Sequence, residues 1–388
     1  MRLSFVLFGL IPVLAAAQGR PVDQGPKNVP EFRPAFAAQT RAPAADSGVT
    51  LRRETFVSGL AHPWGIAPLP GGGYLVTERP GRMRRISPDG SVSAPIEGIP
   101  PVLAESQGGL LDVTLGPDFR ADRMIYWTYA KPMGGGLSAT AAARGVLAPD
   151  FSRVSAVEDI FVQSPPSPAP AHYGSRILFD GAGHAFITTG EHFTPRERVL
   201  AQDKDVTYGK VLRIRPDGSI PEDNPFGNAV WSYGHRNPQG AAFDAKGTLW
   251  MVEHGPAGGD ELNRPAAGEN HGWPVISYGE NYGGDPVGSG KSAAEGMEQP
   301  VYYWDPVIAP GGMTFYDGTM FDAWRGDALI ASLNPGGLVR LSIEDGRVTG
   351  EERFLQGMRI RDVELAPDGA VLVLVDAADG EILRLTPQ

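Results

Sequence analysis

The stretch PDGAVLVLV, residues 367–375, is the clearest example of the unit from which this chain is built. A Pro-Asp-Gly turn is followed at once by the apolar run Val371–Val375, a composition typical of a buried β-strand. The same order of polar turn and apolar run recurs toward the N-terminus. The other runs are Tyr74–Thr77, Met124–Tyr129, Ala185–Thr189, Leu249–Val252 and Ala328–Ser332.

Six spaced runs of this kind favour an all-β chain folded as a six-bladed β-propeller. One run per roughly 60 residues exceeds the ~40–50 of well-known blade repeats, which predicts long loops between blades. The 51 Gly and 36 Pro residues also favour short strands over long helices. A β-sandwich is the alternative, because Asp-Gly turns occur in any β protein, but a sandwich does not need six spaced units.

The N-terminus, MRLSFVLFGLIPVLAAAQ, predicts a secretory signal over residues 1–17. Arg2 precedes the apolar run Leu3–Leu14, and Ala15–Ala17 supply an A-x-A cleavage site. The run is too short for a membrane span, which needs about 20 apolar residues. The chain has no Cys, so disulfides and lipid attachment at a cysteine are excluded. We therefore expect a periplasmic or secreted protein with no membrane span.

The rest of the chain divides into two parts. Residues 18–50 are rich in Pro and Ala with little periodicity, which predicts a loosely ordered N-terminal extension. Residues 51–388 form the predicted propeller domain. The net charge of −11 argues against a nucleic-acid partner, because phosphate binding needs a basic surface.

The segment Trp231–Pro274 carries most of the candidate chemistry. It contains WSYGHRNPQG, EHGPAGGDELN and GENHGWP, in which Gly and Pro recur too often for a helix. Loops between short strands are where binding groups usually lie. The segment therefore predicts a site for an oxygen-rich small molecule or a hard cation.

Zinc and dinucleotide sites are not indicated. The chain has no His-x-x-x-His pair of the zinc-hydrolase type. Gly181-Ala182-Gly183 lacks the third glycine of a dinucleotide fingerprint and precedes a strand rather than a helix. His172 lies in a Pro-rich loop, where a histidine is more often structural, but an exposed imidazole there is a candidate base.

Two further groups each leave two interpretations open. Arg359 and Arg361 lie two apart in a strand-like stretch, so both guanidinium groups face one side. They suit a ligand with several carboxylates, or they pair with Asp362 or nearby acids on a solvated face. The loop Gly255-Pro256 before Asp260 is either a source of carbonyl ligands for calcium or an ordinary acidic surface loop.

Taken together, these motifs resemble the soluble aldose sugar dehydrogenases that use pyrroloquinoline quinone (PQQ), within the glucose/sorbosone dehydrogenase family. The resemblance covers Leu51 to Gln388. The motifs that carry it, in chain order, are QGGLL (107–111) with PDF (117–119), HYGSR (172–176), GHRNPQG (234–240), EHGP (253–256), DELN (260–263), GWP (272–274) and RIRDV (359–363). The family fold is a six-bladed propeller, in agreement with the repeat.

The resemblance implies a role for each matching position. His172 corresponds to the general base that takes the proton of the sugar C1 hydroxyl, and Arg236 to the residue that stabilises negative charge on the quinone. The carbonyls of Gly255 and Pro256 correspond to ligands of a calcium ion that PQQ also binds. The Glu261 side chain and the His271 carbonyl correspond to a second, structural calcium site. Cofactor contacts are implied for Gln107, Asn237, His254, Arg359 and Arg361.

Two positions depart from the family pattern. Asn334 stands where many relatives carry a cofactor-binding Lys, so an amide without charge replaces a cation. Ala171 stands where relatives often place Asp or Asn before the base, which removes a polar contact near the substrate. These departures leave both the strength of PQQ binding and the sugar preference open.

The resemblance implies a periplasmic dehydrogenase that oxidises aldose sugars to lactones and passes electrons to an unidentified acceptor. The protein is then a monomer or a homodimer. One alternative is a propeller of the same fold that binds a ligand or partner without redox chemistry. A calcium-dependent lactonase is a further alternative, against which the Gly-Pro carbonyls and the paired arginines argue.

Overall fold

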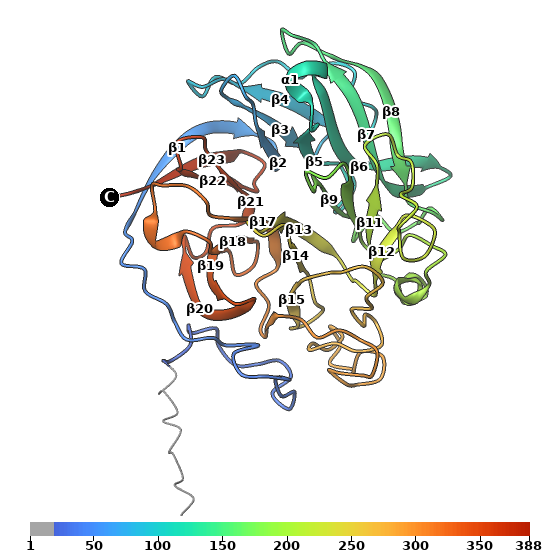
Figure 1. Ribbon diagram of the computed structural model, residues 1–388, viewed down its shortest axis with the longest axis vertical. Coiled ribbons are helices and arrows are strands. Elements are labelled where there is room, and N and C mark those ends of the chain that lie inside the picture. Colours follow the sequence, from blue (N-terminus) through green and yellow to red (C-terminus); the bar gives the residue numbers. More distant parts are fainter. Residues whose placement is uncertain (1–18) are drawn as a thin grey trace, which may run out of the picture.

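The computed structural model describes residues 19–388, and the expected signal sequence lies outside them. Within these residues, six small antiparallel sheets stand in a ring (Figure 1). Five sheets have four strands and one has three. The chain is a six-bladed β-propeller, as the repeat predicts.

The blades follow one another in chain order. Blade 1 contains β2 (Pro63–Pro68), β3 (Tyr74–Glu78) and β4 (Arg82–Ile86), and blade 2 contains β5 (Leu110–Leu115), β6 (Met124–Gly134), β7 (Leu137–Leu147) and β8 (Val154–Val162). Blade 3 contains β9 (Gly174–Phe179), β10 (Ala185–Thr189), β11 (Lys210–Ile214) and β12 (Val230–Tyr233), and blade 4 contains β13 (Pro238–Phe243), β14 (Leu249–Glu253), β15 (Asp260–Asn263) and β16 (Tyr302–Trp304). Blade 5 contains β17 (Pro310–Phe315), β18 (Ala328–Ser332), β19 (Gly337–Glu344) and β20 (Arg347–Phe354), and blade 6 contains β21 (Ile360–Leu365), β22 (Val371–Val375), β23 (Gly380–Pro387) and β1 (Leu51–Leu60).

Helices are few and short. The connections hold α1 (Phe119–Asp122), α2 (Pro195–Arg198), η1 (Val199–Gln202) and η2 (Asp322–Trp324). No helix in residues 19–388 has the length and apolar character needed to cross a membrane.

Each of the six apolar runs found in the sequence is the second strand of a blade. The runs coincide with β3, β6, β10, β14, β18 and β22. Every residue of β3, β10, β14 and β18 is buried. Both faces of these strands pack against neighbouring blades, so the sequence shows a continuous apolar run instead of alternation.

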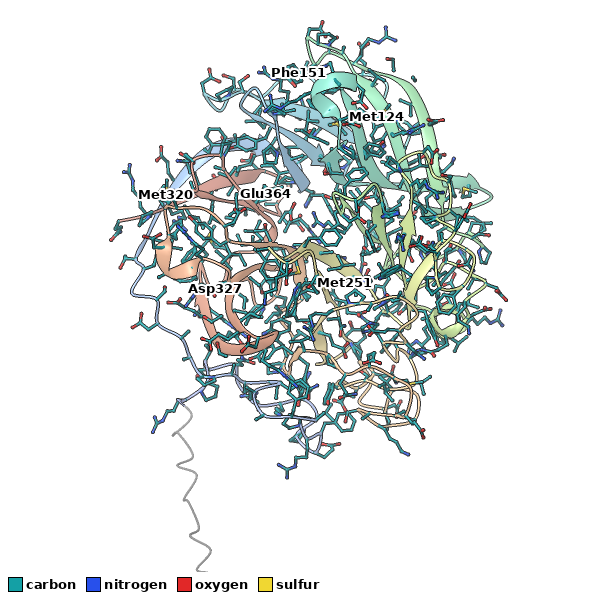
Figure 2. All side chains as sticks on the ribbon, viewed as in Figure 1. Met124, Phe151, Met251, Met320, Asp327 and Glu364 are labelled. Carbon is teal, nitrogen blue, oxygen red and sulfur yellow. The ribbon has the colours of Figure 1, made fainter. Side chains whose placement is uncertain are left out.

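The hydrophobic core is distributed around the ring, with side chains filling the spaces between neighbouring blades (Figure 2). Among the described residues, each of the six interfaces between blades has its own cluster of buried apolar side chains. Met83 of blade 1 and Trp127 of blade 2 share one cluster, and Trp250 of blade 4 and Ile330 of blade 5 share another. The ring must therefore close for every blade to bury both faces.

Closure is made by the first strand of the domain. β1 pairs antiparallel with β23, the last strand, from Leu51 opposite Pro387 to Leu60 opposite Gly380. Blade 6 thus joins the two ends of the propeller.

The N-terminal extension differs from the loosely ordered segment that its composition predicts. Residues 19–50 run along the outside of the ring beside β20 and lead into β1 (Figure 1). The backbone N–H groups of Asn28 and Val29 donate to the Asp305 carboxylate at 2.8 and 3.0 Å. The N–H of Ala42 donates to the Tyr302 hydroxyl at 3.0 Å. Specific backbone hydrogen bonds to blade residues hold this segment, although it has no regular structure of its own.

Candidate active site

The candidate site lies at one end of the ring, where the inner strand of each blade begins. The inner strands contact one another around the ring. Each pairs antiparallel with the second strand of its blade, so Pro238 at the start of β13 lies opposite Glu253 at the end of β14. Residues just before an inner strand therefore meet residues at the end of a second strand. This topology brings His172, Arg236 and Arg359 to the same end of the propeller.

His172 lies two residues before β9 and is buried, with 4% of its surface exposed, which contradicts the expected exposed loop. The loop that follows β10 covers it, and the Phe193 ring packs edge-on against the imidazole with 5.1 Å between centroids. Nδ1 of His172 lies 3.2 Å from Oε1 of Glu191, whose side chain is also buried. The sequence showed no direct sign of this pair.

The surroundings of His172 keep its ring neutral. Burial, and then the positive charges of Arg236 and Arg198, lower the pKa of His172 well below its ordinary value. Burial raises the pKa of Glu191. With the Nδ1 proton directed at Glu191, the Nε2 lone pair is the basic atom of the ring. The imidazole can therefore accept a proton at neutral pH.

Two amide side chains position the segment around His172. The Gln107 Oε1 accepts from the backbone N–H of His172 at 2.9 Å, and the Asn237 Oδ1 accepts from the N–H of Gly174 at 3.0 Å. The Asn237 carbonyl also accepts from the N–H of His254 at 3.2 Å. Gln107 and Asn237 thus link blades 2, 3 and 4 at the site.

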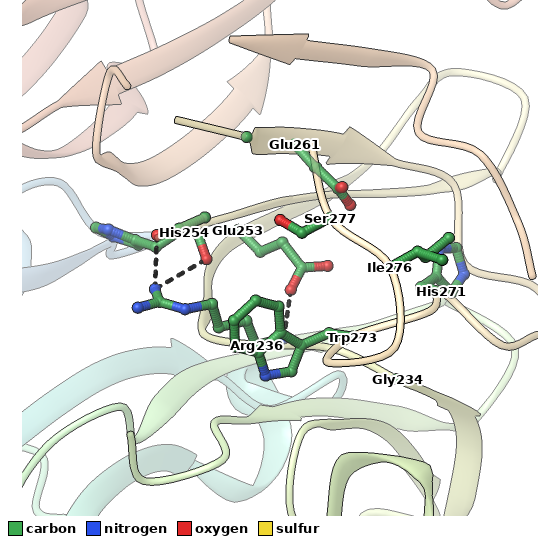
Figure 3. Close-up of a pocket in the computed structure, with 11 residues that line it drawn as sticks. Gly234, Arg236, Glu253, His254, Glu261, His271, Trp273, Ile276 and Ser277 are labelled. Atoms are coloured by element: carbon green, nitrogen blue, oxygen red, sulfur yellow. Dashed lines mark hydrogen bonds between the residues drawn. The ribbon is translucent and has the colours of Figure 1, made fainter. Parts of the chain in front are cut away.

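Arg236, in the connection between β12 and β13, lies beside His254 and the Trp273 ring (Figure 3). Its backbone N–H donates to the Glu253 carboxylate at 2.6 Å. One terminal nitrogen donates to the carbonyls of His254, at 3.2 Å, and Gly255, at 2.7 Å. The guanidinium group lies 5.2 Å from the centroid of the Trp273 ring. The side chain is held with its charge at the site, and its Nε has no partner among residues 19–388.

The backbone of EHGP and DELN is set by buried acids rather than by an exposed acidic loop. Both Asp260 and Glu253 are buried. The Asp260 carboxylate accepts from the N–H of Gly255 at 2.7 Å and from the N–H groups of Ile308 and Ala309 at 2.8 and 2.7 Å. This carboxylate orients the Gly255 turn and joins blade 4 to the start of blade 5. The acidic surface loop, one of the two interpretations left open, is therefore wrong.

A second polar group lies next to Arg236. It consists of Glu253, Glu261, His235 and His271. The Glu253 Oε1 lies 2.9 Å from Nδ1 of His235, and Asn263 donates to both Glu253 and Glu261 at 3.0 Å. Burial opposes the charged form of Glu253, but His235 and its hydrogen bonds hold the pKa of Glu253 below its ordinary value. Burial and the charge of Glu253 raise the pKa of Glu261. Two carboxyl groups thus lie close together, that of Glu253 buried and that of Glu261 half-buried.

The residues expected at a structural calcium site lie around one small hollow. Glu261, on β15, and His271 both line it, together with Ser277 (Figure 3). The His271 ring stacks on His235 with 4.6 Å between centroids, and neither of its nitrogens has a hydrogen-bond partner within residues 19–388. In the same residues, no group of three or more His, Asp or Glu side chains has the arrangement of a metal site. Any cation here would depend on carbonyl oxygens together with one or two carboxylates.

The paired arginines do face one side, and both bind one acid. Arg359 Nε and Arg361 terminal nitrogen lie 3.0 and 2.8 Å from Oδ2 of Asp376. The His62 Nδ1 lies 2.8 Å from the other oxygen of Asp376. Burial opposes the charge of Asp376, but Arg361, His62 and Arg359 hold its pKa far below the ordinary value. Asp362, the partner considered from sequence, pairs instead with Arg176 at 3.2 Å.

Other expected positions take different places in the site. The Arg359 side chain is half exposed, whereas Arg361 is 10% exposed and also donates to Gln239 Oε1 at 2.7 Å. The His254 Nε2 is buried and has no partner among residues 19–388. Pro256 is buried, while Asn334 is exposed after β18, and its side chain makes no hydrogen bond within the described residues. Asn334 therefore takes no part in the polar network of the site.

Sequence reasoning missed the acids that hold the functional side chains. Glu253 is the last residue of β14, Asp376 directly follows β22, and Glu191 is the second residue after β10. A search for acidic residues in the first two positions after each apolar run finds all three, because the end of every second strand reaches this end of the ring.

Over most of its length the chain is similar in sequence to a known protein family. The model described as glucose/sorbosone dehydrogenase matches residues 60–384. The aldose sugar dehydrogenase YliI of Escherichia coli is 41% identical over 350 residues, which cover 87% of this chain and 94% of that protein.

Solved structures give the same result. The soluble aldose sugar dehydrogenase of Escherichia coli in its apo form aligns with a TM-score of 0.84 and 40% identity, over 87% of this chain and all of that chain. The PQQ-bound form of an aldose sugar dehydrogenase from Streptomyces coelicolor aligns with a TM-score of 0.72 and 28% identity, over 89% of this chain and all of that chain.

Proposed function

The chain belongs to the glucose/sorbosone dehydrogenase family, and from this premise we propose that it oxidises aldose sugars at the anomeric carbon to lactones with PQQ and calcium. Sugar oxidation by an aldose sugar dehydrogenase is the activity that its relatives carry in their names. The calcium ion, the proton transfer to His172 and the lactone product are our inferences from the site.

The polar groups at the site suit an anionic, planar cofactor. Arg236, Arg359 and Arg361 bring three guanidinium groups to one end of the ring, opposed by the carboxylate of Asp376. The buried Nε2 of His254, which has no hydrogen-bond partner in the described part of the chain, adds a polar atom that a ligand would satisfy. Arg359 and Arg361 would hold carboxylate groups of PQQ, because guanidinium groups bind carboxylates through paired hydrogen bonds.

The same site offers oxygen ligands for calcium. The Gly255 carbonyl accepts from Arg236 at 2.7 Å and keeps a second lone pair for a cation. We propose that Gly255 and Pro256 carbonyls hold the catalytic calcium ion. The half-buried Glu261 carboxylate and the His271 carbonyl would hold the structural ion, where positive charge offsets the repulsion between Glu261 and Glu253.

His172 is the proposed general base that removes a proton from the substrate. The neutral imidazole would take the proton of the C1 hydroxyl at Nε2, while Glu191 holds Nδ1 and stabilises the resulting imidazolium. When bound, PQQ supplies the acceptor for the two electrons and the hydrogen that leave C1, and calcium supplies a Lewis acid beside that acceptor. Arg236, held by Glu253 and Trp273, would place its charge where negative charge develops.

The buried pair of His172 and Glu191 beside Arg236 is the observation that carries this proposal. Its test is reconstitution with PQQ and Ca²⁺, followed by measurement of aldose-dependent dye reduction. We expect wild type to be active and His172→Gln to lose activity by at least 10²-fold while it still retains PQQ absorbance after desalting. Equal activity of the two proteins would refute the role of His172. A wild type that retains no PQQ would support the non-redox propeller instead.

The setting of the reaction is also a proposal. The N-terminal sequence predicts export, so we propose that the enzyme works in the periplasm or outside the cell. Electrons would then pass to an acceptor in the same compartment. Detection of the mature N-terminus near Gln18 in a periplasmic or culture-supernatant fraction would test the assignment.

A further inference from the structure

Two aromatic rings are exposed at the entrance of the candidate site. Phe193 is 42% exposed and Tyr282 is 67% exposed, which is unusual for such large side chains. Their ring centroids lie 6.3 Å apart. They come from different loops, one after β10 and one between β15 and β16. Exposed apolar groups gathered beside a polar site mark a binding surface.

Phe193 is held in place at a conformational cost. Both His192 and Phe193 have positive φ, at 61° and 73°, a region that bulky residues rarely adopt. The Glu191 carboxylate accepts from the backbone N–H of Phe193, and the same carboxylate contacts His172 through its other oxygen. Strain of this kind persists where surrounding contacts impose it and is concentrated at functional sites. The Glu191 carboxylate thus positions both the His172 imidazole and the backbone of Phe193.

Tyr282 is presented by a tight turn. The N–H of Asn281 donates to the carbonyl of Asp285, and the N–H of Gly284 donates to the carbonyl of Asn281, both at 2.8 Å. The Tyr282 hydroxyl accepts from Arg236 at 3.4 Å, and the guanidinium group of Arg236 lies 6.0 Å from the ring centroid. Tyr282 therefore stands next to the second reacting group of the site.

Arg198, at the end of α2, joins the two loops that carry the rings. It donates to the Asn281 side chain at 2.8 Å and to the Phe193 carbonyl at 3.5 Å. Its guanidinium group lies 5.5 Å from the centroid of the Trp273 ring. The contacts of Arg198 thus fix the position of the Phe193 ring relative to the Tyr282 ring.

The two rings form a platform and not a slot. Their planes are tilted by 33°. A sugar ring between two aromatic faces needs about 3.5–4 Å of carbon contact on each side, or roughly 7–8 Å in all, which exceeds the observed spacing. A sugar must therefore lie on the exposed surface of the pair. Pyranose rings have apolar C–H faces that suit such a surface and hydroxyl groups that suit the Asn281 and Arg198 side chains beside it.

We propose that Phe193 and Tyr282 form a subsite for the second ring of an oligosaccharide whose reducing end is oxidised at His172. The inference rests on the proposed function. The oxidised ring must reach His172, which is buried behind Phe193. The platform lies farther out, at the exposed entrance, so the part of the substrate that contacts it is the ring attached to the oxidised one.

The test compares kcat/KM for maltose with kcat/KM for glucose in the PQQ- and calcium-loaded enzyme. Tyr282→Ala is expected to lower the maltose-to-glucose ratio about tenfold, with most of the loss in KM for maltose. Phe193→Gly is expected to lower it to a similar extent, and glycine adopts the positive φ of this position without strain. Tyr282→Phe keeps the ring and is expected to keep the ratio. Ile220→Ala, an exposed apolar residue in another loop, is the matched control.

Each outcome has a defined meaning. An unchanged ratio in both Tyr282→Ala and Phe193→Gly overturns the subsite. A rise in KM for the electron-accepting dye, equal with maltose and glucose, also overturns it, because the platform would then bind the acceptor. A wild-type enzyme that oxidises neither sugar with PQQ bound refutes the proposed function itself, and that result is distinguishable from failure of the subsite.

Discussion

Replacing Glu191 with glutamine tests how the base is held. The substitution keeps the size of the side chain but removes the negative charge 3.2 Å from Nδ1 of His172. A general base contributes roughly 10²–10⁴-fold to a rate. The contact is long for a charged hydrogen bond, so we expect the low end of that range. A loss of about 10² in kcat/KM corresponds to about 2.7 kcal/mol of transition-state stabilisation.

The pH profile separates this role from a structural one. The pKa of His172 is already well below its ordinary value, so the neutral base persists, and activity is retained, below the ordinary histidine pKa of about 6.5. Loss of the Glu191 charge destabilises the imidazolium further, which lowers the pKa of His172. The acid limb of kcat/KM is therefore expected to move to lower pH in Glu191→Gln, while the maximum rate falls.

The assay is dye reduction across pH with saturating PQQ and Ca²⁺, with bound PQQ measured by absorbance and folding by thermal melting. Glu191→Asp is the matched variant, because it keeps the charge and shortens the reach. It should retain the acid limb of wild type better than Glu191→Gln does. Full activity with an unshifted acid limb in Glu191→Gln would refute the argument.

Other parts of the structure lead to four further expectations. Asp376→Asn should destabilise the cofactor-free protein by about 3 kcal/mol in urea unfolding, because it leaves the buried Arg361 without its carboxylate. The pKa of Asp376 in the folded protein is depressed, so this difference in stability should be complete above about pH 4 and shrink as the pH falls further. Asn334→Lys, which adds a cation at an exposed position, should tighten PQQ binding by up to about fivefold in a titration. An unchanged affinity would show that Asn334 does not weaken PQQ binding. Chelation of calcium should lower Tm in wild type but hardly in Glu261→Gln, and equal shifts would argue against an ion at Glu261. Tyr302→Phe removes the acceptor for the Ala42 N–H and should lower the free energy of unfolding by about 1–3 kcal/mol and speed proteolysis within residues 19–50. Unaltered proteolysis would mean that other contacts hold the extension.

The fold was largely predictable because each second strand is buried on both faces. Runs such as Ala185–Thr189 and Ala328–Ser332 match β10 and β18 residue for residue. The inner strands were harder to recognise. They carry buried charged residues, including Arg176, which pairs with Asp112 at 2.8 Å and with Asp362 at 3.2 Å. These acids lie 64 and 186 residues away, so no local pattern reports the pairing.

The candidate site was predictable in its motifs and less so in its contacts. The order of HYGSR, GHRNPQG and EHGP carried the resemblance, and the structure brings these motifs to one end of the ring. The burial of His172 was not predicted, because the Pro-rich loop before it resembles a surface loop. The covering residue, Phe193, belongs to a different connection, and Tyr282 comes from a loop about 90 residues farther along the chain.

Local sequence specifies the strands, the turns and the number of blades, because burial and turn chemistry act over a few neighbouring residues. Which groups meet at the site is decided by the tertiary structure. Glu191 reaches His172, and Asp376 reaches Arg361, when the first two strands of a single blade pair. Gln107 reaches His172, and Phe193 lies beside Tyr282, only after different blades have packed. Each blade must bury both faces against its neighbours, so the ring has to close, and closure by β1 and β23 aligns the ends of all inner strands. The site therefore combines acids that strand pairing within one blade brings to their partners, such as Glu191, with residues such as Gln107 and His62 that the closed ring brings from other blades.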